Sequence, residues 1–242
     1  TSASASEIFA GAIQDYQRGI VLGGQTFGKG TVQEIIPMDY GQVKLTRSKF
    51  YRISGASTQH RGVIPDIEFP DFYDAYEDIG ESSLDGALPW DTVRPVEYRA
   101  YNPNQASVPQ LKSMHEERAK PSPDFIYLLG QIARTRELRD REEISLNESV
   151  VKQEREDTRR QEFEAENMRR VLKGLPLEEW EDEIADEDSS DSLASSDTEV
   201  IEPEENEEDT ELEEDDPLIL ESGRILADYI SLNGRRVSSV NN

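Results

Sequence analysis

An acidic tract near the C-terminus is the feature that most constrains how this chain can fold. Residues 178–216 contain 22 Asp and Glu and no Lys or Arg. Such a segment cannot bury enough apolar surface to offset the loss of chain entropy, so we predict that it is disordered. The other 30 of the 52 acidic residues stand against 26 basic ones, so the net charge of −26 is concentrated here. This strong negative charge argues against binding to nucleic acid.

Residue usage excludes several kinds of chemistry. The chain has no Cys, which removes disulfides, thiol catalysis and thiolate metal sites. Its two histidines, His60 and His115, lie on unrelated segments. We therefore predict no metal site and no cofactor. No apolar run approaches the length of a membrane span, and the opening at Thr1 resembles the middle of a structural element, so we expect a C-terminal fragment whose export signal lies elsewhere.

Residues 1–71 have the pattern of an α/β domain. Ser4 and Glu7 form a Ser-x-x-Glu capping box that predicts a helix ending near Gly19. We predict short strands at 20–22, 31–37 and 42–50 from their β-branched residues and the glycines between them. A closing loop then runs to about Asp71. These elements predict the end of an α/β domain.

The rest of the chain is predicted to be mainly helical. Prolines and Trp90 divide the stretch after residue 71 into short segments, which predict a linker or a small docking region. We predict helices over 123–143 and from a capping box at Ser145 to Lys173, within a linker and helical domain at 72–177. The acidic tract at 178–216 precedes a predicted short helix in 217–242, whose apolar side needs a surface to dock against.

Ser4 stands where a nucleophile would be favoured. The predicted helix begins there, and unpaired backbone N–H groups at a helix N-terminus stabilise negative charge on a nearby oxygen. Ser is also among the commonest residues at this position for purely structural reasons. Taken alone, Ser4 could be no more than a helix cap.

Lys29 lies in a glycine-rich loop that permits two kinds of chemistry. A lysine enclosed by small residues and an aromatic ring loses hydration, and a neutral lysine can act as a general base towards a serine. The same lysine could simply be solvated. The loop also has the Gly-x-x-x-x-Gly-Lys spacing of a nucleotide-binding loop, but Gly30 replaces the Ser or Thr that would hold magnesium, and a strand follows where a helix should begin.

Together these segments resemble a known family. Ser-Ala-Ser-Ala-Ser-Glu at residues 2–7 and Thr-Phe-Gly-Lys-Gly-Thr-Val-Gln at 26–33 resemble the motifs of the tail-specific, or carboxy-terminal processing, serine proteases. Residues 44–51 and 62–66 are similar to the segments that follow in that family, with Ile53 in place of the usual proline. The stretch up to about residue 180 resembles the long periplasmic Prc or Tsp branch.

The resemblance implies a fold and a set of site residues. It implies a ClpP/crotonase-like α/β protease core, of which residues 1–71 would be the C-terminal half, followed by an α-helical C-terminal domain. The family's base lies 25 residues after its nucleophile, which selects Ser4 as nucleophile and Lys29 as base. The resemblance implies that Gln33 orients the lysine, and four residues of strand would keep the two side chains on one face; a solvent-facing Gln33 is the alternative.

Three supporting positions carry open alternatives. Glu7, Asp15 and Thr26 match positions that the family uses around its site. Glu7 could instead be only the partner in the capping box. Asp15 could be a solvated residue at the end of the helix.

The resemblance also implies substrates, partners and a location. It implies a serine endopeptidase of the bacterial periplasm, at or near the inner membrane, that selects proteins by apolar C-terminal tails through a PDZ domain. No part of a PDZ domain is present, so this fragment alone should be inactive. A tetratricopeptide adaptor lipoprotein and murein hydrolases are the implied partners. The alternative is a non-catalytic acidic helical interaction protein, which would leave the spacing of Ser4, Lys29 and Gln33 as coincidence.

Overall fold

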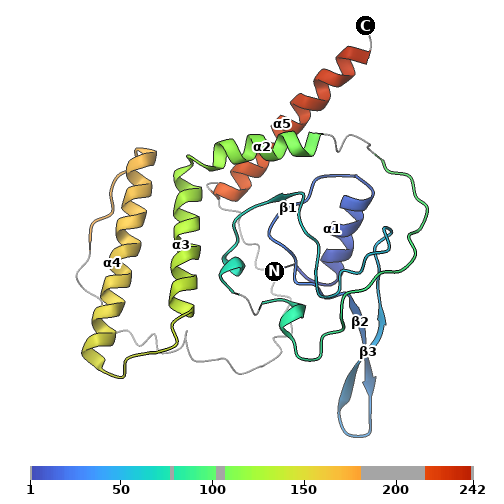
Figure 1. Cartoon of the computed structure of the whole chain (residues 1–242), viewed down its shortest axis with the longest axis horizontal. Coiled ribbons are helices and arrows are strands. Elements are labelled where there is room, and N and C mark those ends of the chain that lie inside the picture. The colour runs from blue at the N-terminus through green and yellow to red at the C-terminus, as the bar shows by residue number, and fades with distance from the viewer. Residues whose placement is uncertain (1, 77–78, 102–106, 181–215, 241–242) are drawn as a thin grey trace. The chain divides into compact units, whose positions relative to one another are not determined.

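The computed structural model describes residues 2–76, 79–101, 107–180 and 216–240 (Figure 1). Contacts divide the chain into one unit formed by Thr1–Ile144 with Pro217–Asn242 and a second formed by Ser145–Asp216. Most of the predicted disordered tract, from residue 181 to 215, lies outside the described residues. The elements along the chain are α1 (Ala5–Asp15), β1 (Leu22–Gly23), β2 (Thr31–Pro37), β3 (Gln42–Lys49), β4 (Ile67–Glu68), two 3-10 turns (Phe72–Ala75 and Glu81–Ser83), α2 (Val108–Ala119), α3 (Pro123–Arg139), α4 (Glu148–Lys173) and α5 (Pro217–Val240).

Helix α1 begins as predicted and ends early. Ser4 is its N-cap, and Glu7 accepts a hydrogen bond from the Ser4 backbone N–H at 2.8 Å, the return half of a capping box. The helix ends at Asp15 and not near Gly19, because Gln17 adopts a φ of 53°, which a helix cannot contain.

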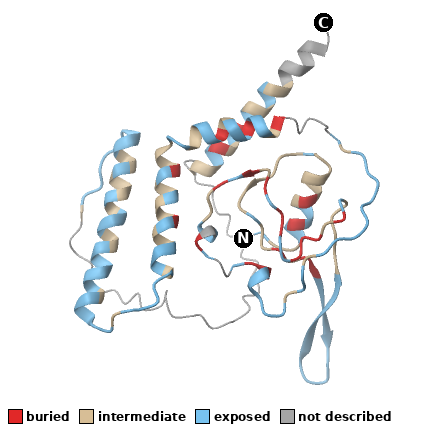
Figure 2. Cartoon of the chain, in the orientation of Figure 1, coloured by how far each residue is buried: buried red, intermediate tan, exposed pale blue. Residues whose placement is uncertain are grey.

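The strands form two separate pairs. β1 and β4 are parallel, with Leu22 opposite Ile67. β2 and β3 form an antiparallel hairpin whose register shifts between Val32 and Gln33, where one strand carries a bulge. Figure 2 shows that the hairpin is exposed along nearly its whole length. It nevertheless carries large apolar side chains on both strands, including Val32, Ile35, Ile36, Val43 and Leu45.

The segment after residue 71 docks against the α/β part, so the docking alternative was the better prediction. Trp90 donates its indole N–H to the carbonyl of Ser57 at 3.0 Å, and the Arg61 guanidinium lies 3.8 Å from the Trp90 ring centroid. Asp91 accepts hydrogen bonds from Lys49 Nζ and the Tyr51 hydroxyl. The hydrogen bond from Lys49 holds the pKa of Asp91 below its ordinary value.

The final helix has the docking surface that its apolar side predicted. α5 is longer than the short helix expected, and it packs against α2, an element that sequence analysis did not predict. Ile225 of α5 is buried with Leu111 of α2, with Ile67 of β4 and with Phe69, which directly follows β4. Sequence patterns missed α2 because its apolar residues are few and Pro109 stands in its first turn.

A buried charged cluster accompanies this apolar contact. Glu221 of α5 is 1% exposed, and its carboxylate accepts two hydrogen bonds from Arg118 of α2, at 3.0 and 2.8 Å. His115 Nδ1 lies 3.1 Å from the same carboxylate. Burial raises the pKa of Glu221, but the hydrogen bonds from Arg118 and His115 outweigh it and hold that pKa below its ordinary value.

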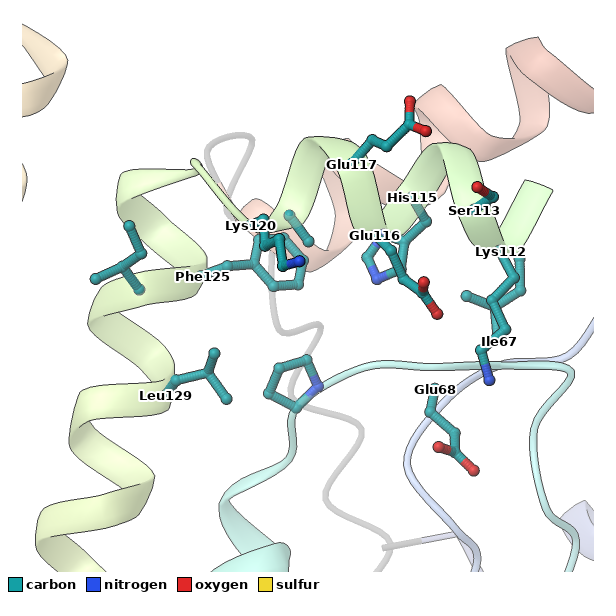
Figure 3. Close-up of a pocket in the computed structure, with 13 residues that line it drawn as sticks. Ile67, Glu68, Lys112, Ser113, His115, Glu116, Glu117, Lys120, Phe125 and Leu129 are labelled. Atoms are coloured by element: carbon teal, nitrogen blue, oxygen red, sulfur yellow. The ribbon is translucent and has the colours of Figure 1, made fainter. Parts of the chain in front are cut away.

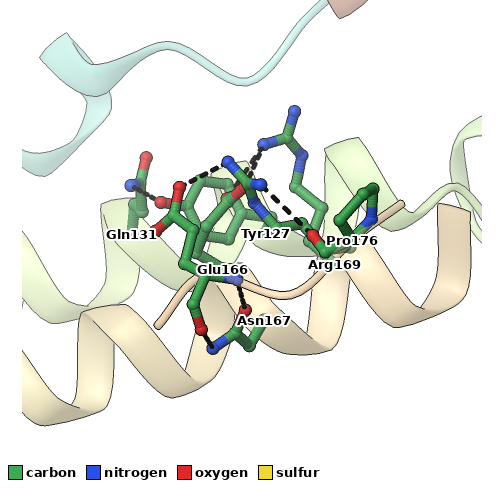
Figure 4. Close-up of polar contacts among 8 residues, drawn as sticks. Tyr127, Gln131, Glu166, Asn167, Arg169 and Pro176 are labelled. Atoms are coloured by element: carbon green, nitrogen blue, oxygen red, sulfur yellow. Dashed lines mark hydrogen bonds and ion pairs between the residues drawn. The ribbon is translucent and has the colours of Figure 1, made fainter. Parts of the chain in front are cut away.

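In the second unit, α4 starts from a different cap than predicted. The N-cap is Asn147, whose side chain accepts from the Ser149 N–H, so the predicted capping box at Ser145 is wrong. The predicted end is confirmed, since Gly174 is a left-handed C-cap. The chain then folds back along α4. Asn167 exchanges hydrogen bonds with the backbone of Glu178, and Glu166 pairs with Arg169 and Arg170 (Figure 4).

Among the described residues no helix combines the length and the apolar character that a membrane span requires.

A candidate active site around Ser4 and Lys29

Ser4 sits in an unusual backbone conformation. Its φ of 56° and ψ of −111° lie in a region that residues with a side chain rarely adopt. Such strain costs of the order of 1–3 kcal/mol and persists where surrounding contacts fix it, most often at functional sites. Two such contacts are visible on either side: the Phe27 N–H donates to the Ser2 carbonyl, and the Ser4 N–H donates to Glu7. Hydrogen bonds on both sides therefore fix the strained backbone of Ser4, which a helix cap alone does not require.

Glu7 ties the serine segment to the lysine loop. Its carboxylate is fully buried. Oε2 accepts from the backbone N–H of Ser4 at 2.8 Å and of Lys29 at 2.9 Å, and Oε1 accepts from Gly28 N–H and the Thr26 hydroxyl. Four donors compensate the cost of burying this carboxylate. Because the backbones of Ser4 and Lys29 bond to one and the same oxygen atom, the two residues are neighbours in space. Glu7 is thus more than a capping partner.

The lysine loop needs its glycines. Gly28 has a φ of 95°, and a Cβ added there would lie 3.0 Å from the backbone carbon of His60. A Cβ at Gly30 would lie 2.5 Å from the backbone nitrogen of Gln59. Lys29 between them is half-buried, and within the described part of the chain its Nζ has no ion-pair partner. The glycines therefore fix the backbone that carries Lys29.

Thr26 and Asp15 act on this arrangement from two sides. The Thr26 hydroxyl donates to Glu7 and accepts from the Val63 N–H at 2.7 Å, so it couples the lysine loop to the chain that returns from β3. The Asp15 side chain is 9% exposed and accepts two hydrogen bonds from Arg52. The alternative of a solvated Asp15 is wrong, since this carboxylate fastens the end of α1 to the loop beyond β3.

Gln33 lies in β2, whereas Lys29 lies before that strand. Lys29 precedes β2, which begins at Thr31, and the register shift between Val32 and Gln33 places its extra residue, Arg47, on β3. The argument from four residues of strand therefore does not apply to the whole interval, because Lys29 and Gly30 lie outside β2. Gln33 is exposed, opposite Thr46, and its role as the group that orients Lys29 stays a prediction.

Two further residues at this site escaped sequence analysis. Gln59 is fully buried and Glu81 nearly so, and their side chains are joined at 2.9 Å next to the lysine loop. Neither lies in a recognisable motif, and their partners are 22 to 29 residues away in sequence, so no local pattern marks them.

A cavity elsewhere in the same unit is unrelated to these residues. It has a volume of about 560 Å³ and lies between β4, α2 and α3 (Figure 3). Its floor is apolar, with Ile67, Phe125 and Leu129, while Lys112 and Glu116 stand among the charged groups of its wall. None of the predicted site residues lines it.

Comparisons with known proteins match two parts of the chain. The model of Peptidase family S41 matches residues 1–69, and that of the C-terminal domain of tail specific protease matches residues 75–231. The chain therefore belongs to the tail-specific, or carboxy-terminal processing, serine protease family. Membership in family S41 implies a ClpP-like fold for the first part. The second match extends beyond residue 180, where the resemblance seen in the sequence ended, and includes much of α5.

Individual relatives give the same assignment. A tail-specific protease of Haemophilus influenzae is 41% identical over 175 residues, which are 66% of this chain and 25% of the relative. A carboxy-terminal-processing protease of Bartonella bacilliformis is 48% identical over 93 residues, 36% of this chain and 21% of the relative. The carboxy-terminal processing protease CtpB of Bacillus subtilis is 43% identical over 77 residues, which are 31% of this chain and 16% of the relative. This chain spans a quarter or less of the length of these relatives.

Proposed function

We propose that this chain supplies the nucleophile and the base of a serine endopeptidase that cleaves by a Ser–Lys dyad. Ser4 Oγ attacks the carbonyl of the scissile peptide while Lys29 accepts its proton. Lys29 then returns the proton to the leaving amine, and water hydrolyses the acyl-serine. The observation that carries this proposal is the single Glu7 oxygen that accepts from the backbones of both residues.

The supporting residues take distinct parts in this mechanism. Glu7 and Thr26 hold the serine segment and the lysine loop together, and Asp15 fixes the far end of the helix that begins at Ser4. Gln33 orients the lysine, a role that rests on the family resemblance alone. The N-terminal backbone of α1 favours the negative charge that develops during the attack.

We further propose the substrates and setting of the whole enzyme. It would work in the bacterial periplasm and select proteins with apolar C-terminal tails, murein hydrolases among them. A tetratricopeptide adaptor lipoprotein would be its partner. These proposals rest on the resemblance to the Prc branch. The names of the relatives, tail-specific and carboxy-terminal-processing proteases, support the choice of a C-terminal tail.

The test is cleavage of an unfolded reporter protein by the full-length enzyme. Two reporters that differ in a final apolar or charged tail are compared, with wild type, Ser4→Ala and Lys29→Ala, each with and without EDTA. We expect the wild type to cleave the apolar-tailed reporter faster, both variants to be inactive, and EDTA to change nothing. Full cleavage by Lys29→Ala would contradict the assignment of Lys29 as the base. Equal cleavage of the two reporters would contradict the proposed selection of apolar tails.

A further inference from the structure

The backbone on both sides of Lys29 is held by hydrogen bonds from several segments. The N–H groups of Gly28 and Lys29 donate to Glu7, and the Gly28 carbonyl accepts from the His60 N–H at 2.7 Å. The Gly30 carbonyl accepts from the Phe50 N–H. The Gly30 N–H donates to Gln59 Oε1 at 2.8 Å.

Gln59 is itself held by Glu81. The Gln59 side chain is fully buried, and its amide nitrogen donates to Glu81 Oε1 at 2.9 Å. The backbone N–H of Glu81 donates to the carbonyl of Phe27 at 2.8 Å. Glu81 therefore reaches the lysine loop twice, through its backbone ahead of Lys29 and through Gln59 behind it.

This clamp connects the two matched regions of the chain. Gln59 lies in the part that matches the peptidase model and Glu81 in the part that matches the C-terminal domain. Gly30 and the Gln59 backbone are packed in close contact, since a side chain at Gly30 would overlap Gln59. A shift of Glu81 is thus passed to the loop that carries Lys29.

We propose that Gln59 and Glu81 are positioning residues for Lys29, and that the start of the C-terminal domain thereby completes the catalytic base. This inference rests on the proposed function, in which Lys29 is the base. Misplacing a catalytic group by about 1 Å can cost ~100-fold in rate, so loss of the clamp should lower kcat by roughly 10- to 100-fold. KM should stay nearly unchanged, because both side chains are buried.

The chemistry of the pair allows a test by exchange. Gln59→Glu sets two carboxylates at hydrogen-bonding distance with no donor between them, so the clamp fails at neutral pH. Relative to wild type at the same pH, the activity of that variant should recover as the pH falls and a shared proton restores the bond. Glu81→Gln keeps an acceptor and should be tolerated, whereas Glu81→Ala should not. The double variant Gln59→Glu/Glu81→Gln restores one donor and one carboxylate and should regain neutral-pH activity.

The experiment measures kcat and KM of the full-length protease on the apolar-tailed reporter across pH, with thermal denaturation of each variant as a check of folding. Glu117→Ala, on the exposed side of α2, is the matched control. Support requires kcat loss in Gln59→Glu and Glu81→Ala, rescue in the double variant, and a ratio of Gln59→Glu to wild-type kcat that rises as the pH falls. If both single variants match wild type while Lys29→Ala is inactive, the positioning role is refuted and the dyad stands. If Lys29→Ala is active, the proposed function itself fails.

Discussion

Replacing Ile225 by Ala should release α5 from the surface on which it docks. The Ile225 side chain is 2% exposed and belongs to the core cluster with Ile67, Phe69 and Leu111. The substitution removes three carbons, each worth about 0.8 kcal/mol of burial, and leaves a cavity, so the expected loss is about 3 kcal/mol. That loss corresponds to a roughly 100-fold rise in the open population of the helix.

Hydrogen–deuterium exchange of the α5 backbone amides measures this opening. The matched control is Leu226→Ala, one residue along the same helix, where the side chain is 58% exposed. We expect exchange in α5 to accelerate by about 100-fold in Ile225→Ala and by less than about 5-fold in the control. Equal exchange rates in the two variants would refute the docking of α5 through this face.

Three other predictions concern the site and the charged cluster. The folded-state pKa of Glu221 is lowered, so the stabilisation that Glu221 gives is present above its unfolded pKa and is lost as the pH falls through its folded pKa. We therefore expect α5 to open on acidification below about pH 4. Glu221→Gln should weaken this pH dependence of hydrogen–deuterium exchange in α5. Gly30→Ala should lower the melting temperature and abolish cleavage, because the new Cβ would lie 2.5 Å from the Gln59 nitrogen, whereas Gly86→Ala, which meets nothing within 4 Å, should do neither. Glu7→Ala should lower kcat by at least about 100-fold, because three backbone N–H groups and a hydroxyl lose their acceptor; a rate near wild type would contradict the role of Glu7 as the link between serine and lysine.

The local elements of this fold were accessible from the sequence where a strong signal exists. The capping box at Ser4 and Glu7, the glycine at the end of α4 and the proline at the start of α5 each act within a few residues, so their patterns identify the element. Ser145 misled because Asn147, two residues later, offers the better cap. α2 was missed because its helix is held by α5 and β4 and not by its own periodicity.

The candidate site divides in the same way. Ser4 and Lys29 follow from a motif with fixed spacing, but what joins them, the four hydrogen bonds to Glu7, depends on how separate segments approach. The inference that Lys29 and Gln33 share one strand did not hold for the whole interval, because β2 begins only at Thr31. The pairing of Gln59 with Glu81 has no local signal at all, because it arises only when the segment after β4 folds back on the lysine loop.

A double-mutant cycle on Ser4 and Lys29 in the full-length enzyme tests the central claim most directly. Ser4→Ala, Lys29→Ala and the double variant are compared with wild type by their rates on the apolar-tailed reporter, with melting temperatures to confirm folding. Groups that act as a unit are strongly non-additive, so each single variant should lose about as much activity as the double, of the order of 10³-fold or more. Losses that multiply in the double variant would mean that the two residues act independently, and would contradict the dyad.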